Sequence, residues 1–486
     1  MTCLGTRRGA LPVIMLIALL AGACATNPVT GRREFSLMSE AQEIAIGQQQ
    51  DVDVRKEMGV YSDTGIQQYV SDIGLKLARL SERPELPWHF AVVDVPAINA
   101  FALPGGYIYI TRGILPFLQD ESQLAGVLGH EIGHVTARHA ARQYSRATGA
   151  QVGLILGSIF VPGGANVAEL GASGLGLLFL KNGRGDEIEA DGLGVRYAAK
   201  GGWDPAGVPQ MLSTLARIEE ASDNKGVPNW MATHPAPEDR IQRVQASVSE
   251  TEAGATRFIT DHDGYMRRMD GLIFGDNPDQ GVVRGTSFLH AALRFAIDFP
   301  EGWDITNGTS EVVAKQPSTG VVMLMEPVPQ TQGRTMREIA LLSMQQAGFR
   351  PTSGGETTIH GLSAFVATYQ GSLQGMGPVT LRGAHIMQDR SVYFLAGIAP
   401  VDGFSRAEPA FSRTIQSFRP LTRADAEAIR PNRIDLYTAR AGDTWQSIAE
   451  RAGKGVVKAT TLAIMNGHAV GELPRPGERL KIVVGG

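Results

Sequence analysis

The stretch VLGHEIGHVTARHA, residues 127–140, constrains the fold more than any other part of the chain. His130 and His134 lie four residues apart, so on a helix both imidazoles leave the same face and can bind one metal ion. Glu131 follows His130 directly and can reach a water on that metal without being a ligand. The stretch therefore predicts a helix that carries a metal site, and the remaining ligands must come from elsewhere.

A third histidine, His139, lies in the same stretch. We predict that the helix begins after Asp120 and continues to about Ser145, which puts His139 about 140° round the helix from His134. The elongated pattern with a third histidine ligand would also need glycine and histidine at two positions where this chain has alanine. We therefore predict that His139 is structural and points away from the metal.

The segment DEIEAD, residues 186–191, contains the candidates for the third ligand. Glu187 and Asp191 share a helix face, and Glu189 is about 200° from Glu187. In one geometry Glu187 is the ligand and Asp191 accepts a hydrogen bond from the free N–H of a ligand histidine. In the competing geometry Glu189 is the ligand, and no carboxylate lies one turn later. The spacing favours Glu187.

The size and charge of the chain limit its function class. A length of 486 residues predicts about three domains. The hydrophobic fraction of 43%, with 19% charged residues, is that of an ordinary globular protein rather than a disordered one. A formal net charge of -4 offers no basic surface for nucleic acid. We expect no DNA or RNA partner.

The N-terminus is typical of an export signal. Two arginines precede an apolar run that is too short to span a membrane, and small residues follow, so we predict a signal peptide at residues 1–23. The run ends at Cys24 in LLAGACATNP, which resembles a bacterial lipobox with Ala21 where leucine is usual. We expect Cys24 to be acylated. An ordinary signal peptide with an incidental cysteine is the alternative.

The pattern along the chain predicts a multidomain protein. We expect a mainly α-helical domain with a small β-sheet at residues 24–255, and an α+β domain of unknown role at 256–421. The segment 99–110, NAFALPGGYIYI, reads as a strand, a turn and a second strand. The apolar region 151–180 is interpreted either as a buried hairpin or as a segment in shallow membrane contact.

Three motifs occur in order: HEIGHVTARH, GRGDEIEADGLG and THPAPEDR. Over residues 27–250 they resemble the gluzincin-type zinc metallopeptidase family M48, and the opening NPVTGRREFSLMSEAQE is similar to its secreted bacterial lipoprotein members. The resemblance implies a zincin-type fold and one Zn²⁺ per chain. The zinc would be held by three residues: His130, His134 and Glu187. Glu131 would be the general base and Asp191 would support a ligand.

The resemblance also implies roles near the metal for His234 and Arg240. Both are candidates to stabilise the oxyanion of the tetrahedral intermediate, and His234 could instead occupy the open zinc position in a resting state. Where the family usually has Ser-Arg before the glutamate segment, this chain has Gly183 and Arg184. The 99–110 segment either presents an edge strand to an extended substrate or is an ordinary hairpin.

Residues 434–483 resemble a LysM module with βααβ order. The resemblance rests on YTARAGDTWQSIAERAG, TTLAIMNG and LPRPGERLKIV. It implies binding to N-acetylglucosamine-containing glycans, in bacteria usually peptidoglycan, through loops at about 442–445 and 465–469. Trp445 is either a core residue or a platform for sugar stacking. A LysM-like fold without glycan affinity is the alternative.

These observations together favour a zinc-dependent endopeptidase of the bacterial periplasm, held at the outer membrane through Cys24. The family resemblance implies that its substrates are misfolded or misassembled envelope proteins. The rival hypothesis is a latent peptidase that acts mainly as a chaperone or scaffold tethered to peptidoglycan. A third hypothesis is a hydrolase of peptidoglycan cross-bridges.

Overall fold

The computed structural model forms two compact units, residues 1–274 with 433–485 and residues 275–432. No helix in the part of the chain that the structure describes is long and apolar enough to cross a membrane. The predicted signal peptide and the apolar region 151–180 lie outside the residues that the structure describes. The described residues are 24–146, 182–221, 230, 234, 238–252, 257–308, 311–329, 335–373, 375–453, 456–469 and 471–486.

The first unit combines helices with a small sheet, as the sequence predicts. The sheet has the order β3-β5-β4, in which β3 and β5 are parallel, β4 and β5 are antiparallel, and β4 is an edge strand. The sheet consists of β3 (His89–Val93), β4 (Ala100–Leu103) and β5 (Tyr107–Thr111). The helices of the unit are α2 (Glu40–Met58), α3 (Thr64–Ala78), η1 (Leu115–Phe117), α4 (Glu121–Thr136), α6 (Arg184–Lys200), α7 (Gly207–Ala221), α9 (Glu238–Glu252) and α10 (His262–Met269).

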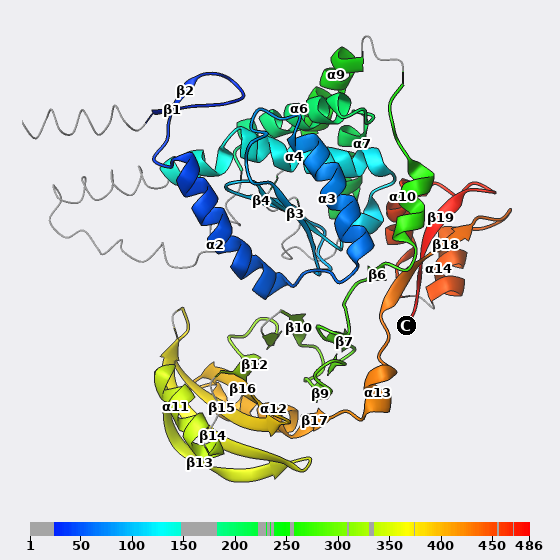
Figure 1. Ribbon diagram of the computed structural model, residues 1–486. Coiled ribbons are helices and arrows are strands. Elements are labelled where there is room, and N and C mark those ends of the chain that lie inside the picture. Colours follow the sequence, from blue (N-terminus) through cyan, green and yellow to red (C-terminus); the bar gives the residue numbers. More distant parts are fainter. Residues whose placement is uncertain are drawn as a thin grey trace, which may run out of the picture. The chain divides into compact units, whose positions relative to one another are not determined.

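Helix α4 carries the histidine motif and contacts α3, α6 and α7 (Figure 1). Its residues from Ser122 to Thr136 are all buried. Two glycines allow the neighbouring helices to approach closely. A Cβ on Gly129 would lie 3.2 Å from the Cα of Gly194 in α6, and a Cβ on Gly126 would lie 3.1 Å from Val208 in α7. This close packing fixes the motif against its neighbours.

Helix α4 ends at Thr136, so the prediction of a helix that continues to about Ser145 is wrong. Arg138 has φ 57°, in the left-handed region that residues with a Cβ rarely adopt. Its guanidinium donates to Glu43 of α2 and to the carbonyl of Met38, and these contacts hold the break in place. Residues 139–146 are helical again. The chain therefore changes direction immediately before His139.

The segment that follows the predicted signal peptide packs against this break. β1 (Cys24–Thr26) and β2 (Arg33–Phe35) form an antiparallel pair. Between them Asn27 is 2% exposed, and its side-chain oxygen accepts hydrogen bonds from the backbone N–H groups of Val29 and Thr30. Its Nδ2 donates to the carbonyl of Ala137 at 3.5 Å. Asn27 therefore joins the N-terminal segment to the end of α4.

The C-terminal segment has the expected βααβ order of β18 (Asn432–Thr438), α14 (Trp445–Gly453), α15 (Ala459–Met465) and β19 (Arg479–Val484). Ile448 is buried, and Gly467, with φ 80°, follows the second helix. Trp445 is 6% exposed and donates through Nε1 to the carbonyl of Glu472, so it is a core residue. A short strand, β6 (Ile273–Phe274), pairs beside β18, in the order β19-β18-β6.

The βααβ segment shares the compact unit and its hydrophobic cluster with the helical domain, although the sequence suggested a separate small unit. Helix α15 contacts α7 and η1. Arg217 of α7 donates to the carbonyl of Gly467 at 2.9 Å, and Gln119 donates to the carbonyl of Met465 at 3.2 Å. The buried Lys481 donates to the carbonyl of Leu118. The loop at 465–469 is thus in contact with the helical domain.

Lys481 predicts a pH dependence of stability. Burial lowers its pKa from the ordinary 10.5 to about 7. Between those values the unfolded chain binds more protons than the folded chain, so this lysine makes stability rise with pH over that interval. Lys481→Met should flatten the rise, measured as the free energy of urea unfolding at pH 7, 8 and 9. Parallel pH curves for both proteins would contradict the prediction.

The second unit, residues 275–432, contains helices and antiparallel sheets, whereas the α+β domain was predicted at residues 256–421. Its main sheet has seven antiparallel strands in the order β10-β11-β12-β16-β15-β14-β13, and a four-stranded sheet has the order β17-β9-β8-β7. Alternate residues of the central strands pack against α11 on one face and α12 on the other. The segments are β7 (Val282–Arg284), β8 (Ser287–His290), β9 (Phe295–Asp298), β10 (Asp304–Asn307), β11 (Val312–Lys315), β12 (Val322–Val328), α11 (Met336–Gln346), β13 (Arg350–Ile359), β14 (Leu362–Leu373), β15 (Gly377–Gln388), β16 (Ser391–Pro400), α12 (Phe404–Ser417), β17 (Arg419–Pro420) and α13 (Arg423–Glu427).

Candidate metal centre

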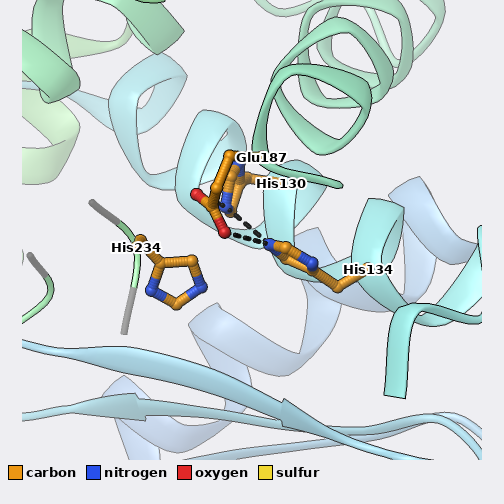
Figure 2. Close-up of side chains that lie close together, drawn as sticks. All are labelled: His130, His134, Glu187 and His234. Atoms are coloured by element: carbon orange, nitrogen blue, oxygen red, sulfur yellow. Dashed lines mark hydrogen bonds and ion pairs between the residues drawn. The ribbon is translucent and has the colours of Figure 1, made fainter. Parts of the chain in front are cut away.

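Three predicted ligands converge between α4 and α6 (Figure 2). The Nε2 atoms of His130 and His134 are 3.0 Å apart. Glu187 places Oε1 3.4 Å from Nε2 of His134 and Oε2 3.7 Å from Nε2 of His130. The i, i+4 spacing on α4 brings the two rings together, and the glycine contacts between the helices bring α6 close enough to add the carboxylate.

The other ring nitrogens show which atoms face the centre. Nδ1 of His130 is 2.9 Å from Oδ1 of Asp191, and a carboxylate only accepts hydrogen bonds, so this Nδ1 carries the proton. Nδ1 of His134 is 2.7 Å from Nδ1 of His139. If both Nδ1 atoms act as donors, both Nε2 atoms present lone pairs to each other and to Glu187. Two imidazole nitrogens and a carboxylate that converge at these distances form a suitable donor set for a metal cation.

The protonation equilibria agree with this donor set. Burial lowers the pKa of both ligand histidines, which favours the neutral imidazoles that bind metals. Burial raises the pKa of Glu187 to about 8 although the nearby Arg240 opposes the rise. A divalent cation would reverse that effect on the carboxyl group. Two imidazole nitrogens and one carboxylate fit Zn²⁺, which leaves a fourth position open in catalytic sites of this kind.

Arg240 of α9 connects the ligands to Asp191. Its Nη1 is 2.9 Å from Oε2 of Glu187, and its Nη2 donates to Oδ1 of Asp191 at 2.8 Å. Burial works to raise the pKa of Asp191, but the hydrogen bonds from Arg240 and His130 outweigh it and the pKa is lowered. The guanidinium therefore keeps two buried carboxylates in place, one at the centre and one behind His130.

Glu131 and His234 lie beside the ligands. Oε1 of Glu131 is 3.6 Å from Nε2 of His234. The ring of His234 stacks on Trp230, with the ring centroids 4.1 Å apart. One ring nitrogen of His234 lies within 4.8 Å of the ligand atoms of His130, His134 and Glu187. Burial raises the pKa of Glu131 and lowers that of His234, in both cases well away from the ordinary value. All seven residues predicted from the sequence are thus brought together.

A cleft opens beside this group. Edge strand β4 forms part of its wall, together with Glu131, His134 and His234. Among the described residues, the cleft is lined by Glu43, Phe101, Ala102, Leu103, Pro104, Glu131, His134, Val135, Arg138, His139, Ala140, Ala141, Gln143, Asn182 and His234. The strand predicted within residues 99–110 therefore borders the candidate site.

Sequence reasoning missed the positions of His139 and Glu189. Both were expected to face away from the metal, and neither belongs to the group of converging ligand atoms. The contact of His139 with His134, and the distance of 3.1 Å between its Nε2 and Oε2 of Glu189, were not predicted. The 140° argument failed because α4 ends at Thr136, before His139. Helix periodicity in the sequence does not predict that Arg138 adopts the left-handed backbone conformation, which changes the direction of the chain.

The chain is similar to known metallopeptidases. Residues 66–248 match the family described as Peptidase family M48. The Beta-barrel assembly-enhancing protease of Escherichia coli (strain K12) is 30% identical over 241 residues, which cover 48% of this chain and 49% of that protein. The Mitochondrial metalloendopeptidase OMA1 of Schizosaccharomyces pombe is 30% identical over 233 residues, which cover 46% of this chain and 66% of that protein. The chain thus spans about half the length of the first relative.

Motif, ligand geometry and sequence similarity define a metallopeptidase domain in the first unit. This domain, at residues 66–248, is a domain of peptidase family M48. Among solved structures, cyanobacterial PsbP from Synechocystis sp. PCC 6803 is 11% identical over 29% of this chain and 95% of that chain, with a TM-score of 0.24. That score is too low to assign a fold to any part of the chain.

Proposed function

We propose that this chain is a zinc-dependent endopeptidase of the bacterial cell envelope that hydrolyses peptide bonds in misfolded or misassembled envelope proteins. The observation that carries the proposal is the convergence of His130, His134 and Glu187, with His134 and the neighbouring Glu131 lining a cleft. The names of the related proteins, a beta-barrel assembly-enhancing protease and a metalloendopeptidase, support it.

Zinc bound in such a site supplies Lewis acidity, which polarises the scissile carbonyl and lowers the pKa of a water toward about 7. Glu131 is the general base: it accepts the proton of the attacking water and passes it to the leaving amine. Burial raises the pKa of Glu131, which makes the carboxylate a stronger proton acceptor. The low-dielectric surroundings strengthen each of these electrostatic interactions.

The remaining residues divide into positioning and contact roles. Arg240 and Asp191 are bound to each other and to ligands, so we assign both to positioning rather than to contact with the oxyanion. His234 lies across from Glu131 and is the candidate donor to the oxyanion. An extended substrate segment would add to the outer edge of β4 through backbone hydrogen bonds.

The envelope location and the glycan contact are further parts of this proposal. An acylated Cys24 would anchor the protein to the outer membrane on its periplasmic side. The βααβ segment would bind peptidoglycan glycan as a LysM module. Because the loop at 465–469 contacts Gln119 and Arg217, the loop at 442–445 is the better candidate for sugar contact.

A latent peptidase acting as a chaperone or scaffold is the second candidate, and the position of His234 favours it. A ring nitrogen of His234 lies close to the three ligand atoms, so His234 could occupy the fourth coordination position of the metal in a resting state. On that account His234→Ala gains casein cleavage. If His234 instead donates to the oxyanion, the same variant loses activity, and an unchanged rate would also count against latency.

The experiment that tests the main proposal measures zinc content and casein cleavage on the full mature chain. We expect one zinc per chain by elemental analysis, cleavage that stops on chelation, and recovery when zinc is added back. One zinc per chain without cleavage would favour the latent candidate. A zinc-free protein that cannot take up zinc would refute the metal centre. Muropeptide analysis after incubation with sacculi would detect cross-bridge hydrolysis.

A further inference from the structure

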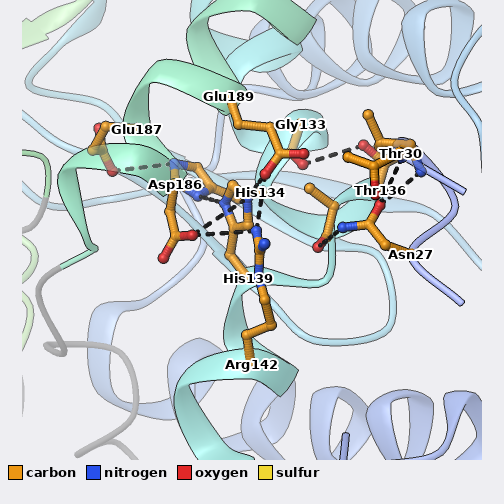
Figure 3. Close-up of polar contacts among 12 residues, drawn as sticks. Asn27, Thr30, Gly133, His134, Thr136, His139, Arg142, Asp186, Glu187 and Glu189 are labelled. Atoms are coloured by element: carbon orange, nitrogen blue, oxygen red, sulfur yellow. Dashed lines mark hydrogen bonds and ion pairs between the residues drawn. The ribbon is translucent and has the colours of Figure 1, made fainter. Parts of the chain in front are cut away.

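We propose that His139 is a positioning residue for the metal ligand His134 and that Glu189 holds His139 in that role. The proposal rests on the proposed metal centre and adds a second support to it, opposite the one that Asp191 provides for His130. Figure 3 shows the three side chains in a row between α4 and α6.

The contact between the two histidines is close and buried. Their Nδ1 atoms are 2.7 Å apart, and the ring planes meet at 76° with centroids 4.8 Å apart. His139 is 1% exposed, so no bulk water competes for this hydrogen bond. Because two N–H groups cannot face each other at this distance, one Nδ1 must donate and the other must accept.

Glu189 decides which nitrogen donates. Its Oε2 is 3.1 Å from Nε2 of His139 and accepts from Nη2 of Arg142 at 2.9 Å. A guanidinium can only donate hydrogen bonds, so the oxygen that Arg142 contacts is an acceptor. His139 therefore donates through Nε2 and accepts through Nδ1, which makes His134 the donor through Nδ1.

The consequence for His134 is a fixed tautomer and a fixed ring orientation. Its proton stays on Nδ1, and its Nε2 lone pair faces His130 and Glu187. Without an acceptor at His139, the ring of His134 could rotate or carry its proton on Nε2, and either change removes a ligand. Partners of this kind typically affect metal affinity by about 10- to 100-fold.

The His139 cluster is not itself a convincing second metal site. His139, Asp186 and Glu189 offer ligand atoms within 4.8 Å of one another. However, Nη2 of Arg142 lies 2.9 Å from Glu189 and 3.2 Å from Asp186, so a cation already neutralises these carboxylates. Nδ1 of His139 is also engaged by His134. The cluster is arranged to support a ligand rather than to bind another ion.

The test compares His139→Phe and His139→Asn in the full chain. Phenylalanine keeps a flat ring but has no acceptor, whereas the asparagine oxygen can still accept a hydrogen bond from His134. We expect zinc affinity, measured by competition with a chelator, to fall about 10- to 100-fold in the phenylalanine variant and to recover largely in the asparagine variant. The visible absorption spectrum of the cobalt-substituted protein should change in the first and resemble wild type in the second.

Glu189→Gln provides a second measurement that keeps the size of the side chain. Its amide oxygen still accepts from His139 without the charge, so we expect a smaller loss of zinc affinity than in His139→Phe. Unchanged zinc affinity in His139→Phe, or equal losses in the phenylalanine and asparagine variants, would overturn the proposal. Because metal binding is the readout, a wild-type protein that binds zinc but cleaves no casein would still test it.

Discussion

Glu131→Gln is expected to lower the rate of casein cleavage by about 10²- to 10⁴-fold while the protein keeps one zinc per chain. Glu131 is buried beside His234 and is not one of the converging ligand atoms. Glutamine has the same shape and can still take part in hydrogen bonds, but it cannot accept the proton of the attacking water. The variant therefore separates the chemical step from metal binding.

The measurements are kcat on casein and zinc content of the purified proteins. Glu220→Gln, at an exposed position at the end of α7, is the matched control and should behave as wild type. Loss of zinc from Glu131→Gln would mean that Glu131 is a ligand. Cleavage within a few-fold of wild type would remove Glu131 from the role of general base.

Removal of residues 433–486 is expected to destabilise the peptidase domain severely, although none of these residues reaches the metal centre in the described structure. The truncation deletes the strand beside β6 and exposes the faces of α7 and η1 that α15 covers. Each large apolar side chain that loses its cover costs about 1.5–3 kcal/mol, against a total stability of about 5–15 kcal/mol for a typical protein. Since α7 packs on α4, zinc binding should be lost as well.

Thermal melting and zinc content of the truncated chain provide the test. Leu473→Ser is the matched control, because Leu473 is 60% exposed in the same segment and its replacement should leave the melting temperature unchanged. A truncated protein that melts cooperatively at the wild-type temperature, with one zinc bound, would show that the segment is an independent module.

The parts of the site that the sequence predicts are those governed by helix periodicity. His130 and His134 follow from their i, i+4 spacing, and the pairing of Glu187 with Asp191 follows from the same rule. The role of His139 does not follow, because it depends on the break at Arg138. That break is held by Glu43 and Met38, about a hundred residues earlier in the chain, and no local pattern reports such a contact.

The fold divides in the same way. The order of elements in the C-terminal segment follows from local signals such as the glycine after α15, and the alternation of the α+β domain follows from strand periodicity. The packing of the C-terminal segment against the helical domain could not be predicted from local signals. In the sequence, Gln119, Arg217 and Lys481 look like ordinary polar surface residues. Only the folded chain shows that they bond to backbone carbonyls across the unit.

If Cys24 is acylated as proposed, the position of Asn27 would limit the distance between the peptidase domain and the membrane. Asn27 is buried against the end of α4, next to the break that leads into the cleft, and only three residue steps separate it from Cys24. Fully extended, three residues reach about 10 Å. A lipid on Cys24 would therefore tether the domain close to the membrane. It would confine proteolysis to a thin layer at the membrane surface.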